Sequence, residues 1–273
     1  MKSLLVLLTF VSLLFSTASN AARGPAYGNG AAFLIDNEVV VKSLSDFPAP
    51  VAGVITLAAN TTYRINGTID IGSNRIVANT ANVIYGVDPI NDSITSSNSG
   101  NCFSGVDVFF IIDTLSLSCA NGTTLDFSES SATKTYVVSV ERVVFLPSVK
   151  IGNFTDLFRV AFFQSGGSSH TAGLTFNGSS NGEFAAHFFA SGVVTGTMFD
   201  FGTAVFDEIN ISDSPYVASG SNVWIAGTAG GANMSAGNIG QVKNNSITGV
   251  GTPVLTNISK DDEEWGIFGN TDV

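Results

Sequence analysis

Short apolar stretches separated by polar turns fill the chain from about residue 54 onward. Each stretch is rich in β-branched or aromatic residues and is closed by Gly, Asn, Asp or Ser, a pattern typical of β-strands. Helical periodicity is nearly absent from this region. The pattern therefore predicts an all-β protein. The expected strands are Val54–Leu57, Tyr63–Ile65, Thr68–Ile71, Arg75–Val77, Asn82–Tyr85, Val106–Ile112, Thr114–Ser118, Tyr136–Val140, Arg142–Leu146, Phe158–Phe163, Gly173–Phe176, Thr197–Phe201, Val205–Ile211 and Val223–Ile225.

A longer period connects the centres of these stretches. Apolar centres recur every 22 to 27 residues, at Phe103, Phe127, Phe154, Phe176, Phe199, Trp224 and Ile247. One coil of a parallel β-helix uses a similar number of residues, and successive coils stack like residues on like. The sequence thus predicts a single right-handed parallel β-helix. A β-sandwich or jelly roll is the alternative, because antiparallel architectures are also built from short strands.

The first residues have the layout of a secretory signal. Lys2 precedes an apolar run from Leu4 to Phe15, and small residues follow through Ala22. The run is short of the roughly 20 residues that a membrane-spanning helix needs, so no membrane span is expected. We expect a signal peptide over residues 1–21, an N-terminal extended segment and cap over 22–50, and the β-helix over 51–273. An uncleaved N-terminal anchor is the alternative.

The last residues of the expected N-terminal segment have an amphipathic pattern. Val41–Pro50 reads as a short amphipathic cap with Leu44 and Phe47 turned inward. Such a cap would cover the exposed strand edges at one end of the stack.

Composition and charge narrow the expected partners. Only 12% of the residues are charged, the formal net charge is −11, and Lys and Arg form no cluster. Nucleic acid and anionic lipid both require a basic surface, so neither is expected as a partner. A surface kept wet by hydroxyls and amides is common among extracellular sheet proteins. In an exported protein the two cysteines, Cys102 and Cys119, could form a disulfide, and two buried free thiols are the alternative.

Two segments carry a resemblance to a known family. Ala52–Thr95, with ITLAANTTYRINGTIDIGSNRIV followed by VIYGVDPINDSIT, resembles the opening coils of parallel β-helix proteins among bacteriophage structural and tail-spike-like proteins. Leu255–Val273 resembles their closing coil. These proteins belong to the pectate-lyase-like superfamily, so the resemblance implies a β-helix, a surface that engages polysaccharide and a possible homotrimer. The signal-like N-terminus is a departure, since virion proteins usually lack one.

Few residues of the sequence are candidates for catalysis or metal binding. Hydrolysis of polysaccharide requires two carboxylates at a defined separation. The strongest set is Asp200 with Asp207 and Glu208; other pairs are Asp107 with Asp113 and Asp126 with Glu129. The ordered motifs of polygalacturonases and the acidic calcium cluster of pectate lyases are missing. The two histidines, His170 and His187, have no companion motif for a metal or a catalytic triad, and no cofactor is expected.

Asparagine followed by Ser or Thr at the second position recurs along the chain. Ten such sequons occur, at Asn60, Asn66, Asn91, Asn121, Asn153, Asn177, Asn210, Asn233, Asn244 and Asn257. In a eukaryotic secretory path these would be acceptors for N-linked glycans. A chain with Asn-rich corners and Ser/Thr-rich strands also generates sequons by composition alone.

These observations favour a non-enzymatic structural or carbohydrate-binding β-helix, secreted or displayed at the cell surface, with a virion as the alternative location. A polysaccharide lyase or hydrolase of the tail-spike type is the second hypothesis, with Asp200, Asp207 and Glu208 as its candidate catalytic residues. A host surface adhesin is the third.

Overall fold

The computed structural model describes residues 37–128, 138–146, 149–153, 158–164, 169–176, 181–190, 193–212, 225–227, 240–244, 255–256 and 265–269. These residues lie in the compact unit Asp36–Val273. They form a parallel β-solenoid, which confirms the all-β prediction and excludes the antiparallel alternatives. The strands are β1 (Asn37–Val41), β2 (Val54–Thr56), β3 (Thr61–Ile65), β4 (Thr68–Asp70), β5 (Arg75–Val77), β6 (Ala81–Tyr85), β7 (Ser93–Ser96), β8 (Asn101–Val106), β9 (Phe109–Asp113), β10 (Ser116–Cys119), β11 (Thr123–Ser128), β12 (Val138–Leu146), β13 (Val149–Ile151), β14 (Phe158–Gln164), β15 (Ser169–Phe176), β16 (Asn181–Ala190), β17 (Val193–Asp200), β18 (Val205–Ser212), β19 (Ile225–Ala226), β20 (Gly240–Asn244), β21 (Leu255–Thr256) and β22 (Trp265–Gly269).

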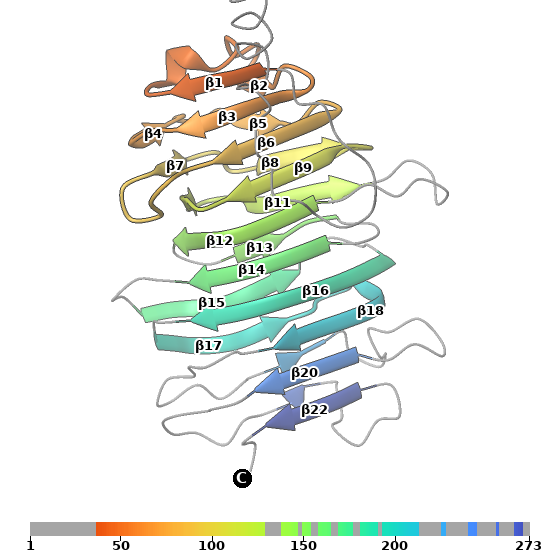
Figure 1. Ribbon diagram of the computed structural model, residues 1–273. Coiled ribbons are helices and arrows are strands. Elements are labelled where there is room, and N and C mark those ends of the chain that lie inside the picture. The colour runs from red at the N-terminus through yellow and green to blue at the C-terminus, as the bar shows by residue number, and fades with distance from the viewer. Residues whose placement is uncertain are drawn as a thin grey trace, which may run out of the picture. The chain divides into compact units, whose positions relative to one another are not determined.

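The strands stack in two parallel sheets (Figure 1). A 9-stranded sheet runs in the order β2-β5-β8-β11-β13-β15-β17-β19-β21. A 13-stranded sheet runs β1-β3-β6-β9-β12-β14-β16-β18-β20-β22, with β4, β7 and β10 as a side branch that joins it at β12. Strands that follow each other in the sequence therefore do not pair with each other, and each strand pairs with a strand of a neighbouring turn.

The first turns of the solenoid have three strands each. They are β2–β3–β4, β5–β6–β7 and β8–β9–β10, and β11 begins the fourth turn. The side branch gives these turns a third face, formed by β4, β7 and β10. In Figure 1, β4 and β7 lie at the same edge of the stack, beyond the ends of β3 and β6.

Rows of inward-pointing side chains, one from each successive strand of a sheet, fill the interior; we call each row a ladder. One ladder in the 9-stranded sheet joins fully buried side chains in strand register: Ile55, Ile76, Phe103, Leu125, Ile151 and Phe176. Successive strands lie about 4.8 Å apart, so each inward side chain packs on the one above and the one below. The ladder stabilises the fold by removing apolar surface from water, at about 25 cal/mol per Å².

The N-terminal cap forms as the sequence predicts. A 3₁₀ turn at Leu44–Asp46 follows β1, and the Asp46 carboxylate accepts the Lys42 and Ser43 backbone N–H groups at 2.9 Å each. The Phe47 side chain is buried and its ring lies 5.4 Å from that of Tyr63, while Leu44 packs partly against the core. Strand pairing itself begins at Asn37, within the segment expected to precede the solenoid.

Two strand predictions are wrong in detail. Val106–Ile112 is not one strand, because Asp107 adopts a positive φ of 55° and separates β8 from β9. Conversely, the described part of the predicted strand Tyr136–Val140 and the predicted strand Arg142–Leu146 belong to one strand, β12 (Val138–Leu146), whose register shifts between Val140 and Val143. Apolar runs alone do not reveal where a single left-handed residue turns the backbone.

The structure confirms that the chain repeats once per coil, but the residues predicted as coil centres do not all lie in the same ladder. Phe103 and Phe176 share one ladder, whereas Phe127 pairs with Gly105 and Phe199 with Leu174. Each strand has more than one inward position, and the largest side chain does not always occupy the same one. Phe154, Trp224 and Ile247 lie outside the described residues.

Candidate functional site

The third face of the solenoid presents polar side chains at regular positions. On β4, β7 and β10 the central residues Ile69, Ile94 and Leu117 point inward and are buried. Side chains alternate across a strand, so their neighbours point outward. We call this outward surface the hydroxyl face; it consists of Thr68, Asp70, Ser93, Thr95, Ser116 and Ser118.

Strand register orders the hydroxyl face into two rows. Thr68, Ser93 and Ser116 form one row, and Asp70, Thr95 and Ser118 form the other. Members of a row repeat at the strand spacing of roughly 4.8 Å. The Ser93 hydroxyl donates to Thr68 Oγ1 at 3.1 Å, so these two hydroxyls are held in a fixed relation. The result is a short array of oxygen atoms on a rigid backbone.

A loop from Gly86 to Asp92 flanks the first row. Ser116 is the most covered member of the face, because its hydroxyl donates to the carbonyl of Pro89 in this loop. The loop is organised by Asp92, whose carboxylate accepts the backbone N–H of Gly67 at 2.9 Å, of Val87 at 2.7 Å and of Asp88 at 3.1 Å. Burial alone would raise the pKa of Asp92, but these donors outweigh it and the pKa lies below its usual range. Asp92 is therefore a structural carboxylate.

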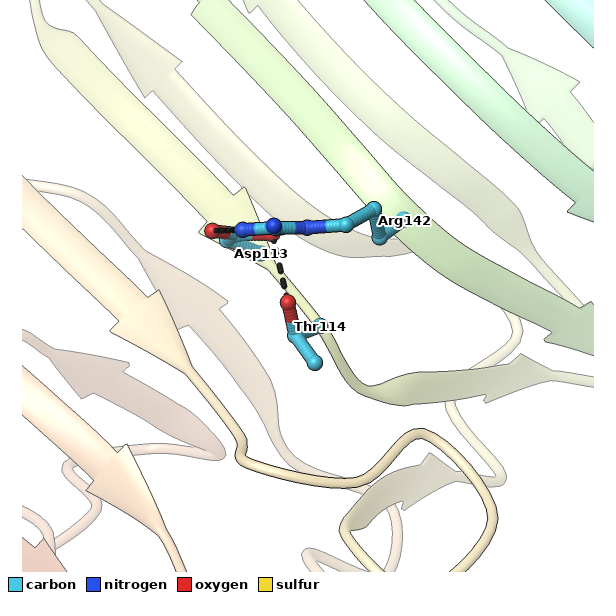
Figure 2. A network of polar contacts seen from close by, with 3 residues as sticks. All are labelled: Asp113, Thr114 and Arg142. Atoms are coloured by element: carbon cyan, nitrogen blue, oxygen red, sulfur yellow. Dashed lines mark hydrogen bonds and ion pairs between the residues drawn. The ribbon is translucent and has the colours of Figure 1, made fainter. Parts of the chain in front are cut away.

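An ion pair lies at the corner between β9 and β10. Figure 2 shows Arg142 reaching from β12 to Asp113 at the end of β9. Arg142 Nε donates to Asp113 Oδ1 at 2.9 Å, its Nη2 donates to Oδ2, and the Thr114 hydroxyl donates to Oδ1 at 2.8 Å. Arg142 therefore engages both oxygens of the Asp113 carboxylate. Asp113 thus positions the corner and does not fit the predicted catalytic pairing with Asp107, which lies beyond the other end of β9.

The strongest catalytic set from the sequence is divided between the two sheets. Asp200 ends β17 in the 9-stranded sheet, and its Oδ1 accepts the Gly202 N–H at 3.0 Å. Asp207 and Glu208 lie in β18 of the 13-stranded sheet, where Glu208 pairs with Glu183 and the register skips Asp207. The side chains of Asp207 and Glu208 are outside the described part of the structure.

The remaining candidates are also engaged or separated. Asp126 accepts the Asn101 side-chain amide through Oδ2 and the Asn153 backbone N–H through Oδ1 at 2.6 Å, while Glu129 lies outside the described residues. His170 and His187 fall in β15 and β16, which belong to different sheets. Among the described residues, no group of three or more His, Cys, Asp or Glu side chains could hold a metal ion.

A disulfide joins two strands of the third turn. Cys102 of β8 and Cys119 of β10 form a disulfide with a Cα–Cα distance of 6.2 Å. Both residues are buried.

In the part of the chain that the structure describes, no helix is long and apolar enough to cross a membrane.

Sequence reasoning missed the hydroxyl face as a defined surface. Of its three strands, Ser93–Ser96 was not predicted as a strand at all. Its sequence, SITS, has a single inward apolar residue between hydroxyls, a pattern too short to stand out among polar turns. The signal that could have found it is the repetition, one coil apart, of triplets in which an apolar residue lies between two polar ones: TID, SIT and SLS.

Comparison with known proteins adds no assignment. No family model matches the sequence, and no curated protein or solved structure is significantly similar to it. The geometry of the solenoid therefore carries the functional argument.

Proposed function

We propose that this protein is a non-enzymatic, extracellular or virion-associated β-solenoid that binds cell-surface polysaccharide through the hydroxyl face. The observation that carries the proposal is the ordered array of Thr68, Ser93, Thr95 and Ser118 hydroxyls beside the Asp70 carboxylate. Hydroxyls both donate and accept hydrogen bonds, which suits them to the hydroxyl groups of a sugar. Their regular spacing along the solenoid suits a ligand that is itself a repeating chain.

The carboxylates favour binding over hydrolysis. Both carboxylate oxygens of Asp92, Asp113 and Asp126 accept hydrogen bonds within the fold, which supports structural roles for these three residues. The resemblance to phage tail-spike-like proteins agrees with a polysaccharide ligand and with a homotrimer. The alternatives are a host adhesin and a tail-spike-type hydrolase using Asp200, Asp207 and Glu208, and a degradation assay separates the hydrolase from the proposed binding protein.

The test is a binding and degradation assay on a panel of bacterial and algal surface polysaccharides. Purified full-length protein from a bacterial host is mixed with each polymer, and both retention and release of soluble oligosaccharide are measured. We expect retention by at least one polymer without release. Release of oligosaccharide that disappears on Asp207→Ala or Glu208→Ala substitution would identify an enzyme and contradict the proposal.

Two variants locate the binding surface. The first replaces Thr68, Ser93, Thr95 and Ser118 with alanine, and the matched control replaces Thr56, Ser104 and Ser128, which lie on strands of the 9-stranded sheet. Each lost hydrogen bond is worth about 0.5–1.5 kcal/mol, so the first variant should bind at least about tenfold more weakly. The control should bind like the wild type. Equal binding by both variants, or no binding to any polymer, would reject the hydroxyl face.

A further inference from the structure

Exposure of the asparagines differs with the residue two positions later. The five sequon asparagines whose exposure the structure describes are all exposed: Asn60, Asn66, Asn91, Asn121 and Asn153. Outside sequons, Asn37 and Asn79 are exposed, Asn74, Asn98 and Asn101 are half-buried, and Asn82 is buried. Exposure is thus more frequent among the sequon asparagines than among the others.

Side-chain contacts identify asparagines that a glycan would disturb. Asn82 Nδ2 donates to the Ala58 carbonyl at 2.7 Å, and Asn98 Nδ2 donates to the Ser73 carbonyl at 2.7 Å, so these amides join neighbouring coils. A glycan on either nitrogen would disturb a bond that the fold uses, and Asn82 is also fully buried. Neither residue belongs to a sequon.

Asn60 and Asn66 are the best placed of the exposed group. They flank β3 at its two ends, in the turns that lead into and out of the strand. Asn60 adopts a φ of 52°, which asparagine tolerates better than most residues, and Asn66 precedes Gly67 with a φ of 99°. By contrast, Asn91 Nδ2 donates to Asp88 Oδ2 at 2.6 Å and Asn121 Nδ2 donates to the Ser97 carbonyl at 3.3 Å.

From these placements we propose that the chain passes through a eukaryotic-type secretory compartment and carries N-linked glycans on Asn60 and Asn66. The buried disulfide between Cys102 and Cys119 agrees with an oxidising compartment. In the reaction, the side-chain Nδ2 bonds to the anomeric carbon of an oligosaccharide carried on a lipid diphosphate. The bond from that carbon to the diphosphate oxygen breaks, the lipid diphosphate leaves with the electron pair, and Nδ2 loses one proton.

The attached glycans would lie at corners and leave the strand faces open. A sequon is modified while the chain is extended, so the burial of Thr62 in the folded protein does not oppose modification of Asn60. What the fold must provide is an open position for the finished glycan, and both side chains have it. The inference goes beyond polysaccharide binding and does not depend on it.

The test is expression of the full chain, with its own N-terminal residues, in cultured insect cells. Protein from the medium and from the cells is treated with a peptide N-glycosidase in ¹⁸O-water and mapped by mass spectrometry, which marks each formerly glycosylated asparagine as labelled aspartate. We expect label at Asn60 and Asn66 in most molecules. Asn79, which is exposed but outside any sequon, is the internal control and should stay unlabelled.

Two variants sharpen the result. Thr68→Ser keeps the Asn66 sequon and should keep its label, whereas Thr68→Ala should lose label at Asn66 and retain it at Asn60. Unlabelled Asn60 and Asn66 in secreted protein would overturn the inference, and so would a chain that never leaves the cytoplasm. Because polysaccharide binding is measured on unglycosylated bacterial material, failure of one proposal is distinguishable from failure of the other.

Discussion

At the scale of single residues, polar side chains form hydrogen bonds with backbone groups at the corners of the solenoid. Strand ladders satisfy the backbone along each face, but the turns between faces leave N–H and C=O groups that still require partners. Asn82, Asn98 and Asp92 each bond a backbone group more than 20 residues away in sequence, at Ala58, Ser73 and Gly67 respectively. These three side chains therefore join successive coils where the strands cannot.

Asp92 gives the first prediction. Replacing it with asparagine leaves one acceptor oxygen where the carboxylate offers two, so the N–H of Gly67 or those of Val87 and Asp88 lose a partner. We expect Asp92→Asn to lower the free energy of unfolding by about 1–3 kcal/mol at pH 7, measured by urea denaturation. Asp70→Asn is the control, because Asp70 is exposed and accepts a single N–H, from Gly72. A loss as large in the control would contradict this role of Asp92.

The same carboxylate makes the effect depend on pH. The pKa of Asp92 in the folded protein lies below its usual range, so its contribution to stability is complete above the unfolded pKa of about 4 and is lost as the pH falls through the folded pKa. The difference in unfolding free energy between wild type and Asp92→Asn should therefore shrink in acid. Urea midpoints of both proteins at pH 7, 4 and 3 test this. A difference that is constant over that range would mean that the ionised form is not the stabilising one.

At the scale of elements, close approach of the corners explains particular glycines. A Cβ added at Gly122, which precedes β11, would lie 2.0 Å from the Gly100 carbonyl oxygen of the previous coil. At Gly100 an added Cβ would meet only the Asn98 side-chain oxygen, at 3.2 Å. Gly122→Ala should cost about 1–3 kcal/mol by overpacking, and Gly100→Ala should cost clearly less, as measured by thermal unfolding. Equal shifts in melting temperature would show that the coils do not approach each other this closely.

The disulfide provides a second prediction about elements. Cys102 and Cys119 are 17 residues apart and bridge β8 to β10 across the third turn. The cross-link restricts the unfolded chain, so a double Cys102→Ala, Cys119→Ala variant should lose about 3 kcal/mol of stability. Wild-type protein denatured in the presence of a reductant should unfold at the same urea concentration as this variant. Two titratable thiols in unfolded, unreduced protein would contradict the bridge.

Element by element, clear turn signals predict a strand better than its length does, since β16, with 10 residues, was not among the predicted strands. Arg75–Val77 was predicted at its observed bounds because Ile76 lies between clear turn signals. Asp107, with a φ angle of 55°, turns the backbone without glycine or proline, so the division of β8 from β9 left no signal in the composition. The hydroxyl face was missed for a related reason, since Ser93 and Thr95 look like turn residues until strand register aligns them with Thr68 and Asp70.

At the scale of the whole molecule, the chain has few charged residues, and its acidic residues outnumber its basic ones. The formal net charge is −11, and the ion pairs in the structure include Glu38–Arg64 and Asp113–Arg142. Like charges spread over a compact body repel one another, and added salt screens this repulsion within a Debye length of about 10 Å at 0.1 M. The chain has 22 Asp and Glu against 11 Lys and Arg, so at most half of its acidic side chains could be paired one to one.

The balance of these two effects has a definite sign. Raising NaCl from 0.01 M to 0.3 M at pH 7 should raise the melting temperature, because the repulsion it screens outnumbers the ion pairs it weakens. Repeating the measurement near pH 4.3, where the net charge approaches zero, should abolish most of the increase. Differential scanning calorimetry at both pH values measures the effect. A melting temperature that falls with salt at pH 7 would mean that specific ion pairs, and not the acidic excess, dominate the electrostatics of this solenoid.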